Sequence, residues 1–140
     1  MDPQIKRAIE AAVKKEALAK TFNMELVELD TGYSVVEMNY TPQLMSNIYE
    51  RAHGGAIFAL IDEAFETASQ TDGTIAVALN VNVTYVSSPE PGVCLRSVAQ
   101  KVSQTKKTAS YDIRVTDGND NLIANCSALA YRTGKPIPFL

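Results

Sequence analysis

Hydrophobic positions in this chain follow two different periods. Between Ile75 and Tyr85, large apolar side chains alternate with small or polar ones. Because successive side chains of a strand point to opposite faces, this alternation predicts a long strand with one face more deeply buried. Other strands are predicted where short runs rich in β-branched and aromatic residues lie between turn residues. Their expected ranges are 24–30, 33–40, 93–103, 108–117 and 122–132.

Two segments show helical spacing instead. Asp2 followed by Pro3 is typical of a helix start, and apolar residues then recur every three or four positions. This pattern predicts an amphipathic helix over residues 3–20. A second helix is predicted from Gly54 to about Gln70, before a turn that contains Asp72 and Gly73. Its apolar face comprises Ile57, Leu60, Ile61, Ala64, Phe65 and Ala68, and the opposite side carries Asp62, Glu66 and Ser69.

The element order predicts an α+β domain. One helix, two strands, one helix and four strands follow each other with short connections, and strands joined so tightly pair antiparallel. A length of 140 residues is typical of one domain. We expect an N-terminal helical segment over 1–22, a core over 23–133 and a C-terminal tail over 134–140.

Composition argues against several classes of protein. The chain has 13 basic and 16 acidic residues, so its net charge of -3 disfavours binding to nucleic acid. No apolar run approaches the roughly 20 residues that span a bilayer, so no membrane partner is expected. With one histidine and two cysteines, neither a disulfide framework nor a two-histidine zinc site is expected. We therefore expect no bound metal. Because a disulfide framework is typical of secreted proteins, we also expect a cytoplasmic location.

Candidate chemistry is concentrated at the start of the second helix. The chain lacks the nucleophile elbow, the phosphate-binding loop and the dinucleotide fingerprint. It does have His53, Gly54 and Gly55 at the helix start, and this helix also bears Asp62. Free backbone N–H groups at a helix N-terminus, aided by the helix dipole, can form an oxyanion hole. A purely structural interpretation stays open beside this one. In it, the glycines only permit a tight turn, His53 only caps the helix, and Asp62 belongs to a solvated face.

A spacing pattern gives these residues a family context. Asn47 precedes His53, Gly54 and Gly55 by a short loop, and Asp62 follows seven positions after Gly55. The pattern resembles the hotdog-fold acyl-CoA thioesterases of the phenylacetic-acid-degradation type. The resemblance implies a curved antiparallel sheet wrapped around a long central helix. It covers about residues 24–132 and includes the segments 82–85 and 104–112.

The resemblance also implies roles for residues. Asp62 would be the general base or the nucleophile in thioester hydrolysis, and the Gly54 N–H of another protomer would polarise the thioester carbonyl. Asn47 and His53 would shape the site. The residues expected to bind substrate are Gly55, Phe58, Lys106 and Lys107. The family assembles as dimers, often as dimers of dimers, and needs no cofactor, because coenzyme A is part of the substrate.

Some positions depart from the family pattern, and some alternatives stay open. Ile48 and Thr105 stand where glycines are common, and Ala78 stands near a frequent hydroxyl. Lys106 and Lys107 either hold the phosphates of coenzyme A or form a charged sheet edge. A non-catalytic acyl-CoA-binding protein and a hotdog-fold dehydratase are the alternative functions. The sequence does not identify the acyl group.

Overall fold

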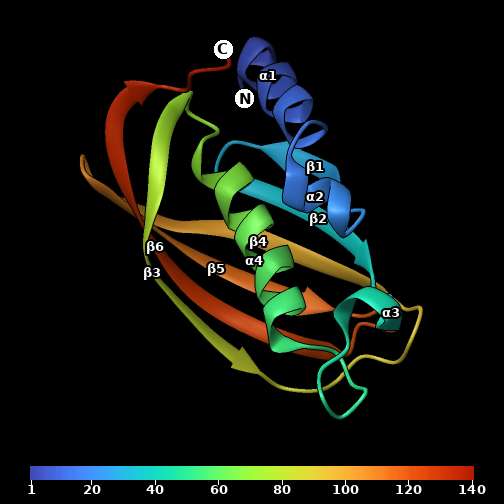
Figure 1. The fold of residues 1–140 in the computed structure, drawn as a ribbon. Helices are drawn as coiled ribbons and strands as arrows, with labels where there is room; N and C mark the ends of the chain where they lie inside the picture. The colour runs from blue at the N-terminus through green and yellow to red at the C-terminus, as the bar shows by residue number, and fades with distance from the viewer.

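A six-stranded antiparallel sheet curves around one long helix in the computed structural model, which describes residues 1–140 (Figure 1). The strand order is β1-β2-β4-β5-β6-β3. The strands are β1 (Glu25–Asp30), β2 (Tyr33–Asn39), β3 (Thr74–Tyr85), β4 (Cys94–Gln104), β5 (Thr108–Thr116) and β6 (Leu122–Pro136). The helices are α1 (Pro3–Val13), α2 (Ala17–Thr21), α3 (Pro42–Met45) and α4 (Gly54–Ser69). This is the α+β class that the element order predicted, in the hotdog arrangement that the family resemblance implied.

The central helix α4 forms where its apolar stripe can be buried. His53 caps its N-terminus, and Leu60, Ile61 and Ala64 are fully buried against the concave face of the sheet. Burying a Leu or Ile side chain contributes roughly 1.5–3 kcal/mol, so this stripe anchors the helix on the sheet. This packing fixes the position of α4, and therefore of its N-terminus, relative to the sheet.

Strand β3 lies at one edge of the sheet. It pairs with β6 along nearly its whole length, and no strand pairs with its other side. Val77 and Leu79 of β3 are about half exposed in the single chain. An edge strand with free backbone groups and exposed apolar side chains is suited to pair with another strand.

The predicted helix over 3–20 was wrong in one respect. It is two helices, because residues 14–16 leave the helical path and Glu16 has an extended backbone. No Gly or Pro marks this break. Val13 on α1 and Ala19 on α2 are both buried in the same core, so the turn lets two short helices pack where one straight helix could not.

The segment between β2 and α4 contains the short helix α3. A bridge between Ser46 and Ala52 closes the loop that follows it. This loop carries Asn47, which is part of the candidate site.

At the other end of the chain, β6 continues beyond the expected end at residue 132. None of the helices is long and apolar enough to cross a membrane.

Candidate functional site

The start of α4 has one backbone donor that the chain leaves free. The His53 Nδ1 accepts a hydrogen bond from the Gly55 N–H at 2.9 Å, which caps the helix and requires that nitrogen to be unprotonated. The Ala56 N–H donates to the His53 carbonyl at 3.0 Å. The Gly54 N–H has no partner in the chain, as expected at the first position of a helix. It is therefore the donor available to a ligand.

Asn47 organises the loop in front of this helix. Its Oδ1 accepts hydrogen bonds from the N–H groups of Tyr49 at 2.9 Å and Arg51 at 3.1 Å. Its own N–H donates to the Arg51 carbonyl at 2.8 Å. The His53 N–H donates to the Met45 carbonyl at 2.7 Å, which ties the end of the loop to α3. Asn47 and His53 thus position the start of α4.

Tyr85 belongs to this site but was interpreted from the sequence only as a strand residue. Its hydroxyl donates to the Gly54 carbonyl at 3.1 Å. A Cβ placed on Gly54 would lie 3.2 Å from the Tyr85 ring, so this position favours glycine for the close approach. A cavity of about 390 Å³ opens here, lined by residues that include Asn47, Arg51, Gly54, Ile57, Tyr85 and Ser87. Only the pairing of β3 with β6 brings Tyr85 to the helix start.

Asp62 lies further along α4 and is half-buried. Its carboxylate forms no hydrogen bond or ion pair within the chain, and burial raises its pKa. Burial also raises the pKa of the Cys126 thiol to about 11, and the Asp62 carboxylate adds to that rise. Because Cys126 pairs with Val83, Asp62 lies toward β6 and the edge strand β3.

Asp62 and Gly54 of one chain are too far apart to act on the same carbonyl. They are separated by eight positions on α4, which corresponds to about 12 Å along the helix axis. Attack and oxyanion stabilisation both occur within hydrogen-bond distance of one carbonyl group. A site that uses both groups therefore needs two copies of the chain.

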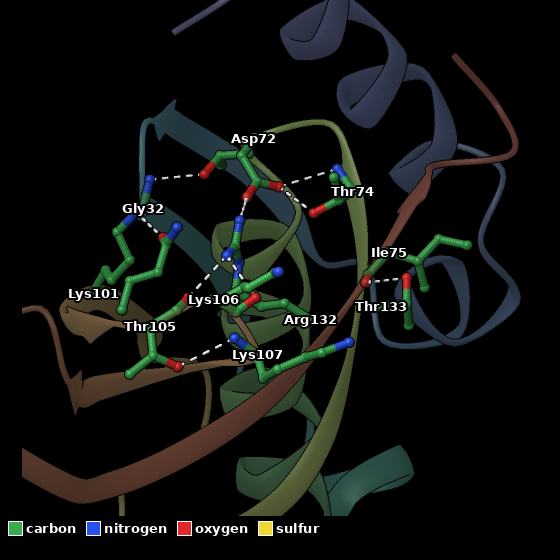
Figure 2. Close-up of polar contacts among 12 residues, drawn as sticks. Gly32, Asp72, Thr74, Ile75, Lys101, Thr105, Lys106, Lys107, Arg132 and Thr133 are labelled. Atoms are coloured by element: carbon green, nitrogen blue, oxygen red, sulfur yellow. Dashed lines mark hydrogen bonds and ion pairs between the residues drawn. The ribbon is translucent and has the colours of Figure 1, made fainter.

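Lys106 and Lys107 lie far from the helix start. They occupy the hairpin between β4 and β5, where Figure 2 shows them beside Arg132. Arg132 donates to the Thr105 and Lys106 carbonyls, at 3.0 Å and 3.4 Å, and pairs with Asp72. Since Asp72 follows the C-terminal end of α4, the length of that helix, about 24 Å, separates this hairpin from Gly54.

Glu63, next to Asp62, is buried rather than solvated. Only 3% of this residue is exposed, and its Oε1 has no hydrogen-bond partner. Burial and the nearby carboxylates of Glu16 and Glu66 raise the pKa of Glu63 to about 8. The helical spacing of the sequence placed Ser69 on the side of α4 opposite the apolar face, but Ser69 is buried. Residues of α1 and α4 line a common cavity, so part of the polar side of α4 is covered.

Stability should depend on pH through Glu63. In a buffer without divalent cations, we expect the free energy of unfolding to fall as the pH rises from about 5 to about 8. Over this range the folded chain keeps a proton that the unfolded chain has released. One such group lowers stability by up to about 1.4 kcal/mol per pH unit. Denaturant titrations at constant protein concentration measure this slope.

The matched variant for this measurement is Glu63→Gln, which cannot titrate. Its stability should vary much less over the same pH range. An equal slope in the variant and the unmodified chain would show that another group is responsible.

Comparison with known proteins adds to this geometry. Residues 49–124 match the thioesterase superfamily. The acyl-coenzyme A thioesterase PaaI of Escherichia coli is 31% identical over 127 residues, which span 91% of this chain and 90% of the relative. The solved structure of the E. coli PaaI protein, from the phenylacetic acid degradation operon, has a TM-score of 0.90 at 30% identity and covers 95% of this chain and 96% of its own. A Streptococcus mutans structure bound to acetyl CoA has a TM-score of 0.77 at 28% identity, covering 82% and 92%.

Proposed function

This chain belongs to the thioesterase superfamily, and we propose that it hydrolyses acyl-CoA thioesters to a free acid and coenzyme A. The observation that carries the proposal is the unpaired Gly54 N–H at the start of α4, which lines an open cavity. A donor in that position matches the negative charge that develops on a thioester oxygen during attack. The E. coli relative named for this activity and the S. mutans structure bound to acetyl CoA support the same substrate class.

In the proposed reaction, Asp62 acts as a general base. It takes a proton from water, and the resulting hydroxide adds to the thioester carbonyl carbon. The Gly54 N–H stabilises the oxyanion, the carbon–sulfur bond breaks, and the thiolate of coenzyme A leaves and is then protonated. The half-buried position of Asp62 raises its pKa, which makes the ionised carboxylate a stronger base. Direct attack by Asp62 on the carbonyl is the nucleophilic alternative.

We propose that the working form is at least a dimer. The 12 Å between Asp62 and Gly54 along one helix requires that the two groups of a site come from different protomers. The open edge of β3, with its exposed Val77 and Leu79, offers a surface for pairing two sheets into one. A dimer of dimers is the larger assembly we propose.

We propose a cytoplasmic location. Cys94 and Cys126 are free thiols, and free thiols persist in the reducing cytoplasm.

Apolar side chains near the helix start are available for the acyl group. Ile48 is 88% exposed and Tyr49 is 76% exposed in the single chain, and Phe58 lies one turn into α4 with its ring partly exposed. We propose that Phe58 contacts the acyl chain and that Ile48 and Tyr49 border the entrance of the pocket that holds this chain. Gly55 makes room for His53, because a Cβ there would lie 3.1 Å from the His53 Nδ1. The proposed reaction uses no cofactor, since coenzyme A arrives as part of the substrate.

Thiol release from a panel of acyl-CoA esters tests this function. Phenylacetyl, benzoyl and straight-chain thioesters should show which acyl group is turned over fastest. We expect catalytic release of coenzyme A from at least one of them. Tight binding without thiol release would instead indicate an acyl-CoA-binding protein. Loss of water from a 3-hydroxyacyl-CoA without thiol release would indicate a dehydratase.

The two hairpin lysines should affect substrate binding more than turnover. If Lys106 and Lys107 hold phosphates of coenzyme A, the double change to Ala should raise KM roughly 3- to 10-fold with little change in kcat. Anchoring a remote phosphate contributes equally to the ground state and the transition state. Initial-rate kinetics separate the two constants. The control is Lys20→Ala, an exposed lysine on α2. An unchanged KM in the double variant would leave Lys106 and Lys107 as the charges of a sheet edge.

A further inference from the structure

A second cavity lies away from the proposed catalytic site, between the N-terminal helices and α4. Its volume is about 580 Å³, and its lining includes Ala8, Ala12, Glu16, Glu66, Gln70 and Phe139. Figure 1 shows α1 and α2 beside the upper part of α4, on the side of that helix away from β5 and β6. None of the residues implicated in thioester hydrolysis lines this cavity.

Three carboxylates lie together beside this cavity, and two of them, Glu16 and Glu66, line it. Glu16 comes from the link between α1 and α2, and Glu63 and Glu66 come from adjacent turns of α4. One carboxylate oxygen from each lies within 4.8 Å of the other two. None of the three forms an ion pair, although Lys15 lines the same cavity. These three carboxyl groups therefore have no cationic partner within the chain.

The buried member of this cluster shows that the arrangement is more than a group of surface acids. Glu63 is 3% exposed, and its Oε1 is inaccessible to solvent and has no hydrogen-bond donor. Burying a carboxylate without a partner is costly, and such groups are normally paired or bound to a metal. The carboxyl groups of Glu16 and Glu66 lie close to it, and a carboxyl group donates a hydrogen bond only when it is protonated.

We propose that Glu16, Glu63 and Glu66 bind one divalent cation that prefers oxygen ligands, of the Ca²⁺ or Mn²⁺ type. Opposed oxygens around Ca²⁺ stand roughly 4.6–5.2 Å apart, so oxygens within 4.8 Å of one another can reach a single ion. The donors are oxygens only, which disfavours zinc. This differs from the histidine zinc site that the sequence argued against, and it does not depend on the thioesterase activity.

The cation would join two parts of the fold. Glu16 belongs to the N-terminal segment, whereas Glu63 and Glu66 belong to the central helix. An ion held by all three fastens α1 and α2 onto α4 without contacting Gly54. Because the unfolded chain does not assemble the three carboxylates, binding should stabilise the folded state.

Thermal unfolding with and without cation tests this site. After treatment with a chelator, millimolar Ca²⁺ or Mn²⁺ should raise the Tm of the unmodified protein by about 5 °C or more. Either Glu63→Gln or Glu16→Gln should abolish the rise, and Glu10→Gln on α1 should keep it. Using both variants matters because Glu16 lies nearer the surface, where a substitution disturbs packing less.

Calorimetry provides a second readout. Titrating Ca²⁺ into the chelator-treated protein should give a saturable heat of binding, which Glu63→Gln should lose and Glu10→Gln should keep. An unchanged Tm in the unmodified protein, or a rise that persists in both Gln variants, would overturn the proposal. The three carboxyl groups would then hold protons and no ion.

Discussion

Replacing Asp62 by Asn should lower kcat by about 10²-fold or more while the protein stays folded and assembled. Asn keeps nearly the same shape but cannot accept a proton at neutral pH or attack a carbonyl as an anion. In the structure the Asp62 carboxylate has no partner in the chain, so its loss breaks no hydrogen bond or ion pair. Steady-state turnover of the preferred acyl-CoA, measured with the oligomeric state, gives the result.

The control for this variant has to come from outside α4. Glu63 is adjacent in sequence, but it is buried and its change would alter stability. Asp120→Asn is better matched, because Asp120 is exposed in the β5–β6 turn at a positive φ of 61° that Asn also tolerates. It should turn over substrate at the unmodified rate. An assembled Asp62→Asn protein with normal turnover would remove the catalytic assignment.

The pH dependence of the unmodified enzyme offers a consistency check on the same residue. Since burial raises the pKa of Asp62, the lower inflection of kcat/KM should lie above the ordinary aspartate value near 4. Activity should rise with pH through that inflection, because the base works only when ionised. This inflection should be absent from the residual activity of Asp62→Asn.

Replacing Gly54 by Pro should lower kcat by about 10²- to 10³-fold, the usual effect of removing one oxyanion donor. Proline has no N–H, yet it is favoured at the first position of a helix. The preceding His53 has the extended backbone that a proline requires, with ψ of 131°. The variant therefore removes the donor without preventing the helix from starting.

Proline also adds side-chain atoms, and Gly54→Ala is the control for them. Its Cβ would lie 3.2 Å from the Tyr85 ring, as the Cβ of proline would, but the N–H stays. We expect Gly54→Ala to lower kcat somewhat through this contact. Gly54→Pro should lower kcat by at least about 10-fold more than Gly54→Ala does. Equal losses in the two variants would mean that crowding, and not the donor, explains the effect.

Features that depend on local periodicity were predictable from the sequence. The strand β3 and the helix α4 begin and end close to the expected residues, because alternation and helical spacing are written into their own segments. The predicted break between Thr31 and Tyr33 is also correct, since Gly32 adopts a positive φ of 66° there. The family was indicated differently, by the resemblance of a motif that includes His53, Gly54 and Asp62 and lies within one short segment.

Features that depend on packing between distant segments were not predictable. Nothing local to residues 14–16 ends α1, and nothing local to Glu63 indicates that the N-terminal helices cover it. Likewise, Gly54 and Gly55 look equivalent in the sequence. Only the hydrogen bond from Gly55 to His53 shows which N–H is left free, and only the β3–β6 pairing brings Tyr85 to the site.

Co-expression of the two inactive variants tests the shared site most directly. In the proposed assembly each site takes Asp62 from one protomer and Gly54 from its partner. Equal amounts of Asp62→Asn and Gly54→Pro chains, mixed at random, should then restore about a quarter of the unmodified turnover, because one pairing in four combines two intact groups. If both groups acted within one chain, every site would carry a lesion. Turnover of the mixture would stay at the level of the single variants, and that result would contradict the account.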